Sequence, residues 1–349
     1  MTTPFEMRGT WTALATPFTA DGTIDLEAYR RLVRFQRDEG ATGVVPCGTT
    51  GESPTLTWEE HDQLVDACVR EGGGRLGVLA GTGSNNTEEA IRGTRDAREH
   101  GASAALLVDC YYNGPSSLEL RTEYYERVLE AVPEIPIVPY VIPGRTGCAL
   151  SAEDLAVLHL GDPKRVPAVK QATGDLERMR RDRALCGEGL AIMSGDDDLT
   201  LPMMRDAGIR AAGVISVMGN LVPGPLSELV RAQASGDAAR AGELGAALAP
   251  LFKLVGVSAP GVRTLPGGRE LSVEDKFRNP VPLKTMMGGL GMIDARCRRP
   301  LGRMTAPAVA TCREALRAVW RAAPEVLRPI EEAFGVRVEA RLEDDACWS

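Results

Sequence analysis

The sequence is poor in histidine, paired cysteines and long apolar runs, and each shortage excludes a class of protein. None of the three histidines lies at a metal-binding spacing from the eight cysteines, which form no CxxC pair, so we expect no metal site. No apolar run approaches the roughly 20 residues that span a bilayer. The first residues, MTTPFEMRGT, lack the regions of a signal peptide. We therefore expect a cytoplasmic protein with reduced thiols and no membrane partner.

Acidic residues outnumber basic ones, 48 to 40, and lysine is much the scarcer of the two basic residue types. The 349 residues carry a net charge of -8, which argues against nucleic acid as a partner. Arginine and lysine together number 40, of which five are lysines: Lys164, Lys170, Lys253, Lys276 and Lys284. An anionic ligand would therefore need a local cluster of arginines.

What the sequence does have is a regular alternation of short apolar runs with helical patterns. Leu26, Tyr29, Leu32 and Val33 recur at helical spacing. Capping boxes at TWEE (57–60) and SSLE (116–119) mark helix starts. The runs are rich in β-branched residues and apolar on both faces, which is typical of parallel strands covered by helices. The predicted strands are residues 12–16, 43–47, 76–80, 105–110, 135–141, 166–171, 190–194 and 212–217.

Eight such units predict an α/β fold, a (β/α)8 TIM barrel over residues 1–222, for which about 250 residues is typical. A doubly wound open sheet is the competing fold, but no GxGxxG follows the first predicted strand. From 223 to 335 the pattern indicates helices without strands, a C-terminal helical appendage. Gly and Pro residues within 258–274 predict a loop insertion there, and we expect 336–349 to be a charged, frayed tail.

Lys170 ends the predicted strand 166–171, at the barrel face where catalytic groups gather. A lysine in a desolvated pocket can lose its proton and attack a carbonyl, whereas arginine stays charged. Lys170 is therefore a candidate for Schiff-base formation. The alternative is an ordinary lysine that reaches solvent or pairs with an aspartate at the strand end.

Other strand ends carry groups that could assist this chemistry. Tyr112 and Tyr140 could supply phenols for proton transfer, although either could be a packed aromatic. Thr49 and Thr50, in the turn GTTG, offer hydroxyls and backbone N–H groups to a carboxylate, although a plain turn would look the same. Arg145 follows Tyr140 in a loop and could hold a second carboxylate, or be a solvated surface residue.

Together these motifs resemble the dihydrodipicolinate synthase and N-acetylneuraminate lyase superfamily. The similarity extends from about Gly9 to Leu221 and returns at NPVPLK (279–284). The motifs that carry it, in chain order, are GTTGESPTL (48–56), GTGSNNTEEAI (81–91), YYNGP (111–115), PYVIPGRTG (139–147), VKQATGDLERM (169–179), SGDDDLTLP (194–202) and GVISVMGN (213–220).

Within that superfamily, the double threonine, YYN and RTG are most similar to the dihydrodipicolinate synthases. The resemblance implies condensation of pyruvate with L-aspartate 4-semialdehyde to 4-hydroxy-tetrahydrodipicolinate, in lysine biosynthesis. It implies that Lys170 forms the imine, that Tyr140 shuttles protons, and that Thr50 and Tyr112 complete the relay. Tyr112 would reach across a subunit interface of a homo-oligomer, a dimer or a tetramer built from dimers.

The resemblance also implies how the substrates are held, without any cofactor. Thr49 and Thr50 would bind the pyruvate carboxylate, and Arg145 the semialdehyde carboxylate. The Ile215 carbonyl would border the site. The usual YNVPSRTG reads YVIPGRTG here, so an Asn and a Ser near the substrate loop are missing.

A second site implied by the resemblance would bind L-lysine as a feedback effector near a dimer interface. Glu89 could meet its ammonium group and Tyr111 its carboxylate. The matching positions are Ser53, Trp58, His61, Asn85, Glu89 and Tyr111.

Two other functions stay open on the sequence. One is a pyruvate-dependent class I aldolase acting on another 2-keto acid, such as a keto-deoxy sugar acid or 4-hydroxy-2-oxoglutarate. Arg145 argues against sugar acids, since a polyol needs neutral hydrogen-bonding groups. The other is a non-catalytic barrel that only binds a keto acid or lysine.

Overall fold

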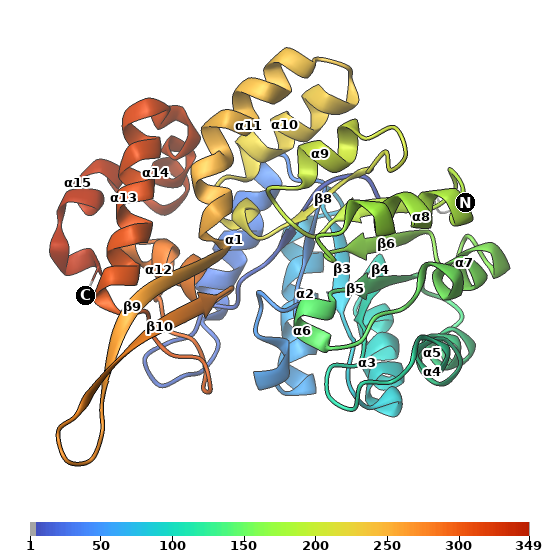
Figure 1. Ribbon diagram of the computed structural model, residues 1–349. Helices are drawn as coiled ribbons and strands as arrows, with labels where there is room; N and C mark the ends of the chain where they lie inside the picture. The colour runs from blue at the N-terminus through green and yellow to red at the C-terminus, as the bar shows by residue number, and fades with distance from the viewer. Residues whose placement is uncertain (1–4, 349) are drawn as a thin grey trace.

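Eight parallel strands close into a barrel in the computed structural model, which describes residues 5–348 (Figure 1). They follow chain order around the barrel, and β8 pairs with β1, with Val214 opposite Thr10. The TIM-barrel prediction is confirmed. The strands are β1 (Gly9–Ala13), β2 (Gly43–Val45), β3 (Gly77–Gly81), β4 (Ala104–Val108), β5 (Ile137–Val141), β6 (Ala168–Gln171), β7 (Ala191–Ser194) and β8 (Gly213–Ser216).

The first strand begins three residues before the predicted run. Thr10 and Thr12 are buried in it although they are polar. The Thr12 hydroxyl donates to Gln36 Oε1 at 2.6 Å, whereas the Thr10 hydroxyl has no hydrogen-bond partner among the described residues. Trp11, between them, packs inside the barrel with apolar residues of other strands. A prediction from apolar content alone therefore places this strand at 12–16, whereas the strand spans Gly9–Ala13.

Helices cover the outside of the barrel, and two larger apolar clusters lie between them and the strands. Both predicted capping boxes are present: Thr57 N–H donates to Glu60 at 2.9 Å, and Ser116 N–H to Glu119 at 2.8 Å. The helical segments of this part are α1 (Leu26–Asp38), η1 (Ser53–Thr55), α2 (Trp58–Gly72), α3 (Thr87–Glu99), α4 (Ser117–Glu119), η2 (Leu120–Tyr125), α5 (Glu126–Ala131), α6 (Pro143–Thr146), α7 (Ala152–Gly161), α8 (Leu176–Cys186), α9 (Thr200–Arg205) and η3 (Met218–Asn220).

Later helices pack beside the barrel and share the cluster that lies under α1 and α2. In Figure 1, α12 to α15 lie to one side of the strands. These segments are α10 (Pro223–Ala234), α11 (Ala238–Phe252), η4 (Lys253–Val255), α12 (Val281–Gly289), α13 (Ala306–Ala322), η5 (Pro324–Val326), α14 (Arg328–Phe334), α15 (Val338–Glu343) and η6 (Asp345–Trp348).

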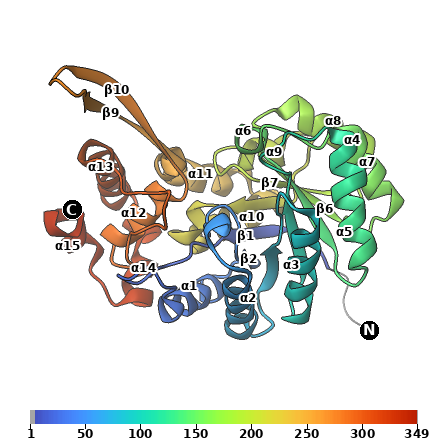
Figure 2. The same cartoon turned by 90° about the horizontal axis from the view of Figure 1, so that it is seen from below.

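The predicted loop at 258–274 is wrong: this segment belongs to an antiparallel hairpin of β9 (Gly256–Thr264) and β10 (Glu270–Arg278). The hairpin projects from the molecule in both views (Figures 1 and 2). Its base is anchored by Val257 and Ala259, which are buried in alternation. The glycines that suggested a loop form its tip, where Gly267 and Gly268 have φ of 100° and 87°.

The predicted tail is also more ordered than expected over residues 336–348. Val338 and Leu342, spaced as on one helix face, are buried in α15. Trp348 donates its indole N–H to Arg341 O at 2.9 Å, and Arg341 donates to the Gly289 carbonyl of α12 at 2.8 Å. These contacts hold the tail against α12. Ser349 lies outside the described residues.

Candidate active site

Lys170 lies inside the barrel near the carboxyl end of β6, in register with Tyr140 of β5 and Met193 of β7. Its side chain is 5% exposed, and its Nζ lies 4.1 Å from the centroid of the Tyr140 ring. Gly195, after β7, leaves room for it, since a Cβ there would lie 3.1 Å from Lys170 Cε. The fold therefore places a buried amine against a phenol.

Burial is the main influence on this amine. Desolvation lowers the pKa of Lys170 from 10.5 to about 8, against the opposing effect of the carboxylates of Asp196 and Asp197; Arg145 lowers it further. About one amine in ten is then neutral at pH 7. Within residues 5–348, Nζ forms no hydrogen bond or ion pair that would hold the proton in place.

The two aspartates belong to the loop after β7. Burial raises the pKa of Asp196 to about 6. Asp197 is buried and accepts hydrogen bonds from the backbone N–H groups of Val217 and Met218, each at 3.1 Å. Asp197 thus ties the loop beside Lys170 to the end of β8.

Tyr140 can donate a proton throughout the neutral range. Its side chain is 6% exposed, and burial raises its pKa to about 12, opposed by Arg145 and by a hydrogen bond with Thr49. Thr50, also buried, accepts a hydrogen bond from Asn279 Nδ2 at 2.9 Å. Both threonines lie in a tight turn after β2, where Gly51 N–H donates to Gly48 O at 3.1 Å.

A cavity of about 320 Å³ opens beside Thr49 and Tyr140, whereas Lys170 and Thr50 are not among its lining residues. Arg145, on α6, lines it and donates to the Asn279 carbonyl at 3.0 Å. The predicted site residues among its lining are Thr49, Tyr140, Arg145, Ser53 and Tyr111.

Two further predicted residues, Ile215 and Tyr112, do not line the cavity. Ile215 is fully buried in β8, in the interior cluster that also contains Tyr140. Tyr112 is 86% exposed and does not line the cavity. The structure of one chain therefore brings together Lys170, Tyr140, the two threonines and Arg145, but not Tyr112.

The six predicted effector residues form two neighbouring groups beside the cavity. His61 packs on Trp58 with ring centroids 4.8 Å apart, and its Nε2 lies 3.3 Å from Ser53 O. On the other side, Tyr111 N–H donates to Asn85 Oδ1 at 2.6 Å. Glu89 accepts a hydrogen bond from the Ser84 hydroxyl at 2.7 Å. The pKa of Tyr111 is raised mainly by burial and, to a smaller extent, by the negative charge of Glu89.

The structure adds residues that the sequence reasoning did not assign. Glu52 and Lys284 form a fully buried ion pair, with Nζ to Oε1 at 2.6 Å, and Nζ also donates to Thr16 O at 2.8 Å. The second Glu52 oxygen accepts from Arg298 N–H at 2.8 Å. This network fixes the turn that carries the threonines. NPVPLK, which contains Asn279 and Lys284, was a motif without a chemical role.

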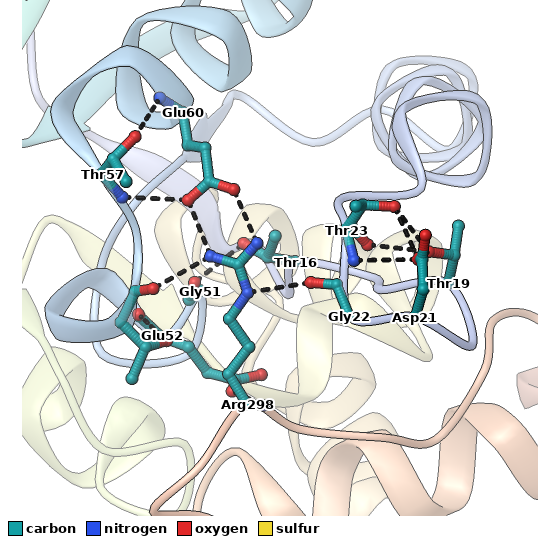
Figure 3. Close-up of polar contacts among 11 residues, drawn as sticks. Thr16, Thr19, Asp21, Gly22, Thr23, Gly51, Glu52, Thr57, Glu60 and Arg298 are labelled. Carbon is teal, nitrogen blue, oxygen red and sulfur yellow. Dashed lines mark hydrogen bonds and ion pairs between the residues drawn. The ribbon is translucent and has the colours of Figure 1, made fainter.

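Figure 3 shows Arg298 at the centre of a further set of contacts. Its guanidinium donates two hydrogen bonds to Glu60, at 2.7 and 2.6 Å, and one to the Gly22 carbonyl at 3.1 Å. Among the described residues, no group of three or more histidine, cysteine, aspartate or glutamate side chains could hold a metal ion. No described helix is long and apolar enough to cross a membrane.

Comparison with known proteins identifies the family of the chain. The model of the dihydrodipicolinate synthetase family matches residues 6–319. A protein of Nitratidesulfovibrio vulgaris (strain Hildenborough) named 4-hydroxy-tetrahydrodipicolinate synthase is 39% identical over 296 residues, 85% of this chain and 92% of that protein.

Solved structures give the same family. The crystal structure of dihydrodipicolinate synthase from Aquifex aeolicus superposes with a TM-score of 0.79 at 37% identity, covering 92% of this chain and 100% of that one. The lysine-bound enzyme from Cyanidioschyzon merolae gives 0.79 at 30% identity, covering 89% and 98%. The chain therefore belongs to the dihydrodipicolinate synthetase family.

Proposed function

We propose that this protein condenses pyruvate with L-aspartate 4-semialdehyde to 4-hydroxy-tetrahydrodipicolinate, in lysine biosynthesis. The observation that carries the proposal is the buried Lys170 amine, whose pKa of about 8 leaves it partly neutral beside the phenol of Tyr140. Membership of the family supports the choice of substrates.

The first half of the reaction uses Lys170 as the nucleophile. Its neutral amine attacks the pyruvate ketone, and loss of water gives the imine. Tyr140, with Thr50, carries the protons that these steps move. Thr49 and Thr50 hold the carboxylate. Loss of a methyl proton then converts the imine to the enamine.

The second half forms the carbon–carbon bond. The enamine carbon attacks the semialdehyde aldehyde, while Arg145 holds the carboxylate through paired hydrogen bonds and the Ile215 carbonyl borders the site. The amino group of the second substrate then attacks the imine carbon. Cyclisation releases Lys170 and closes the cycle.

We infer that the protein is a homo-oligomer, a dimer or a tetramer built from dimers. The support is Tyr112: its side chain is 86% exposed in one chain, which suits a residue that completes the proton relay in a neighbouring copy. All eight cysteines are free, as expected of the cytoplasmic location that we propose.

We also propose that L-lysine binds beside the cavity, between the group of Ser53, Trp58 and His61 and the group of Asn85, Glu89 and Tyr111. The support is that Ser53 and Tyr111 line one cavity, so the two groups face a common space. Millimolar lysine should reduce activity. An activity that does not change over that titration would reject the effector site.

Two experiments test the catalytic proposal in order. Borohydride reduction in the presence of pyruvate should add a three-carbon unit to Lys170, detected by mass spectrometry of the peptides. A barrel that only binds a keto acid would give no adduct. A coupled assay with aspartate semialdehyde then separates a synthase, which consumes it, from an aldolase for another keto acid, which does not.

A further inference from the structure

A second cavity, of about 1020 Å³, lies next to the candidate active site. Its walls come from the loop after β1, from η1 and from residues 296–303, which read RCRRPLGR. Four arginines line it: Arg296, Arg298, Arg299 and Arg303. In a chain with a net charge of -8, this is the local cluster of arginines that an anionic ligand would require.

Two of these arginines are already neutralised. Arg298 forms its two hydrogen bonds with Glu60, as Figure 3 shows, and stacks 4.6 Å from the centroid of the Phe18 ring. Arg296 holds both oxygens of Asp294, at 2.9 and 3.0 Å. These two guanidinium groups form structural walls of the cavity and have little capacity left for a ligand.

The other two are available. The side chains of Arg299 and Arg303 are exposed and form no hydrogen bond or ion pair within residues 5–348, although Arg303 lies near enough to Asp294 to help lower its pKa. Asp21 is the carboxylate in the lining, and its Oδ1 accepts from Thr19 and Thr23 (Figure 3). Arg299 and Arg303 bring two positive charges to the cavity and Asp21 brings one negative charge, so the lining keeps one net positive charge.

The cavity shares a wall with the candidate active site. Pro54, Thr55, Pro300 and Leu301 line both cavities. Arg299 and Arg303 flank Pro300 and Leu301 in sequence. An anion bound by these arginines would therefore lie beside the entrance to the site that contains Tyr140 and Arg145.

We propose that this cavity is a second anion-binding site, in which Arg299 and Arg303 hold a small molecule that carries carboxylate or phosphate groups. Guanidinium pairs bidentately with both groups, and two unpaired arginines can grip a dianion. The apolar side chains of Pro54, Pro300 and Leu301 suit the carbon skeleton of an organic anion. This inference goes beyond the proposed function, because binding does not require turnover.

Calorimetric titration of the full chain with inorganic phosphate, and separately with succinate, tests the site. Saturable binding is expected at millimolar or lower concentration and low ionic strength. The double variant Arg299→Gln/Arg303→Gln should bind at least about tenfold more weakly, since it loses charge-assisted hydrogen bonds. It should fold normally, because neither side chain has a hydrogen bond or ion pair to lose among residues 5–348.

The matched control is Arg321→Gln/Arg328→Gln, which removes the same charge from exposed arginines that line neither cavity. It should bind as the wild type does. Equal weakening in both double variants would mean a general charge effect and overturn the proposal. So would unchanged affinity in Arg299→Gln/Arg303→Gln, or the absence of saturable binding to the wild type.

Kinetics then separates two sources of the anion, and this arm rests on the proposed function. If the second cavity receives the semialdehyde on its way to the active site, Arg299→Gln/Arg303→Gln raises the KM for the semialdehyde, and phosphate competes with the semialdehyde in the wild type. If it holds a separate effector, phosphate changes kcat in the wild type but not in the variant. Trapping of pyruvate on Lys170 should persist in the variant, so a failure of the catalytic proposal is distinguishable.

Discussion

The pH at which Lys170 reacts with pyruvate follows from its burial and from the charges around it. With a pKa of about 8 instead of 10.5, the neutral fraction of the amine at pH 7 rises from about 0.03% to about 10%, roughly 300-fold. The rate of imine formation should therefore increase with pH and level off above about 8. Tyr140, with its pKa near 12, stays protonated over this range.

Two substitutions should move this profile in opposite directions. Asp196, whose pKa is about 6, is ionised at pH 8, and its charge raises the pKa of Lys170. Asp196→Asn removes that charge, so the midpoint should fall below that of the wild type. Arg145 lowers the pKa of Lys170, so Arg145→Gln should raise the midpoint.

The assay is rapid-quench borohydride trapping with pyruvate alone, followed by mass spectrometry of the Lys170 peptide at each pH. Asp198→Asn is the matched control, because Asp198 is exposed and affects Asp196 but not Lys170 directly. Its midpoint should stay at the wild-type value. A wild-type midpoint near that of ordinary lysine, or a shift in the same direction for Asp196→Asn and Arg145→Gln, would refute the reasoning.

Three further predictions concern stability and positioning. Lys170→Met should raise the free energy of unfolding at pH 7 by up to about 3 kcal/mol, because the wild type buries a charged amine at that pH. The difference in free energy of unfolding between variant and wild type should narrow from pH 8 to 10.5, because the wild-type amine is then neutral when folded but protonated when unfolded, so the wild type gains stability. Lys284→Met should lower the free energy of unfolding by about 3 to 5 kcal/mol in denaturant titrations, because Glu52 loses its buried partner; an unchanged midpoint would contradict this. Asn279→Ala should lower kcat about tenfold by releasing the Thr50 hydroxyl, while trapping of pyruvate persists; lost trapping would instead indicate a collapsed site.

The barrel could be predicted from the sequence because each strand and helix is encoded locally. Short apolar runs, helical spacing and the capping boxes at Thr57 and Ser116 need no knowledge of distant contacts. The hairpin β9–β10 could not, because its apolar alternation is confined to the base and its glycines resemble those of a loop. The tail was misjudged because its charged residues outnumber Val338 and Leu342, which anchor it.

Only those candidate site residues that lie at or just after the ends of predicted strands could be found from the sequence. Lys170 and Tyr140 lie near the carboxyl ends of their strands and the threonines follow β2, so the barrel topology brings all four to one face. Asn279 and Lys284 lie more than 200 residues from the turn that they hold, and nothing near them in sequence indicates that turn. Contacts of this kind depend on how the later helices pack.

Two of the five lysines are buried, and the difference between them shows what reactivity requires. Lys284 is fully buried, but a carboxylate and a carbonyl accept its hydrogen bonds, so its ammonium group is held as a structural cation. Lys170 is nearly as buried, yet no acceptor binds its Nζ among residues 5–348, and its nearest described partner is the face of an aromatic ring. Burial without an acceptor lowers the pKa of the amine, so a larger fraction of it is neutral near pH 7, and only the neutral amine can attack a ketone. The reactive lysine is therefore distinguished by the absence of a hydrogen-bond acceptor at its Nζ among the described residues. This is a property of the folded site that the residues next to Lys170 or Lys284 in sequence do not reveal.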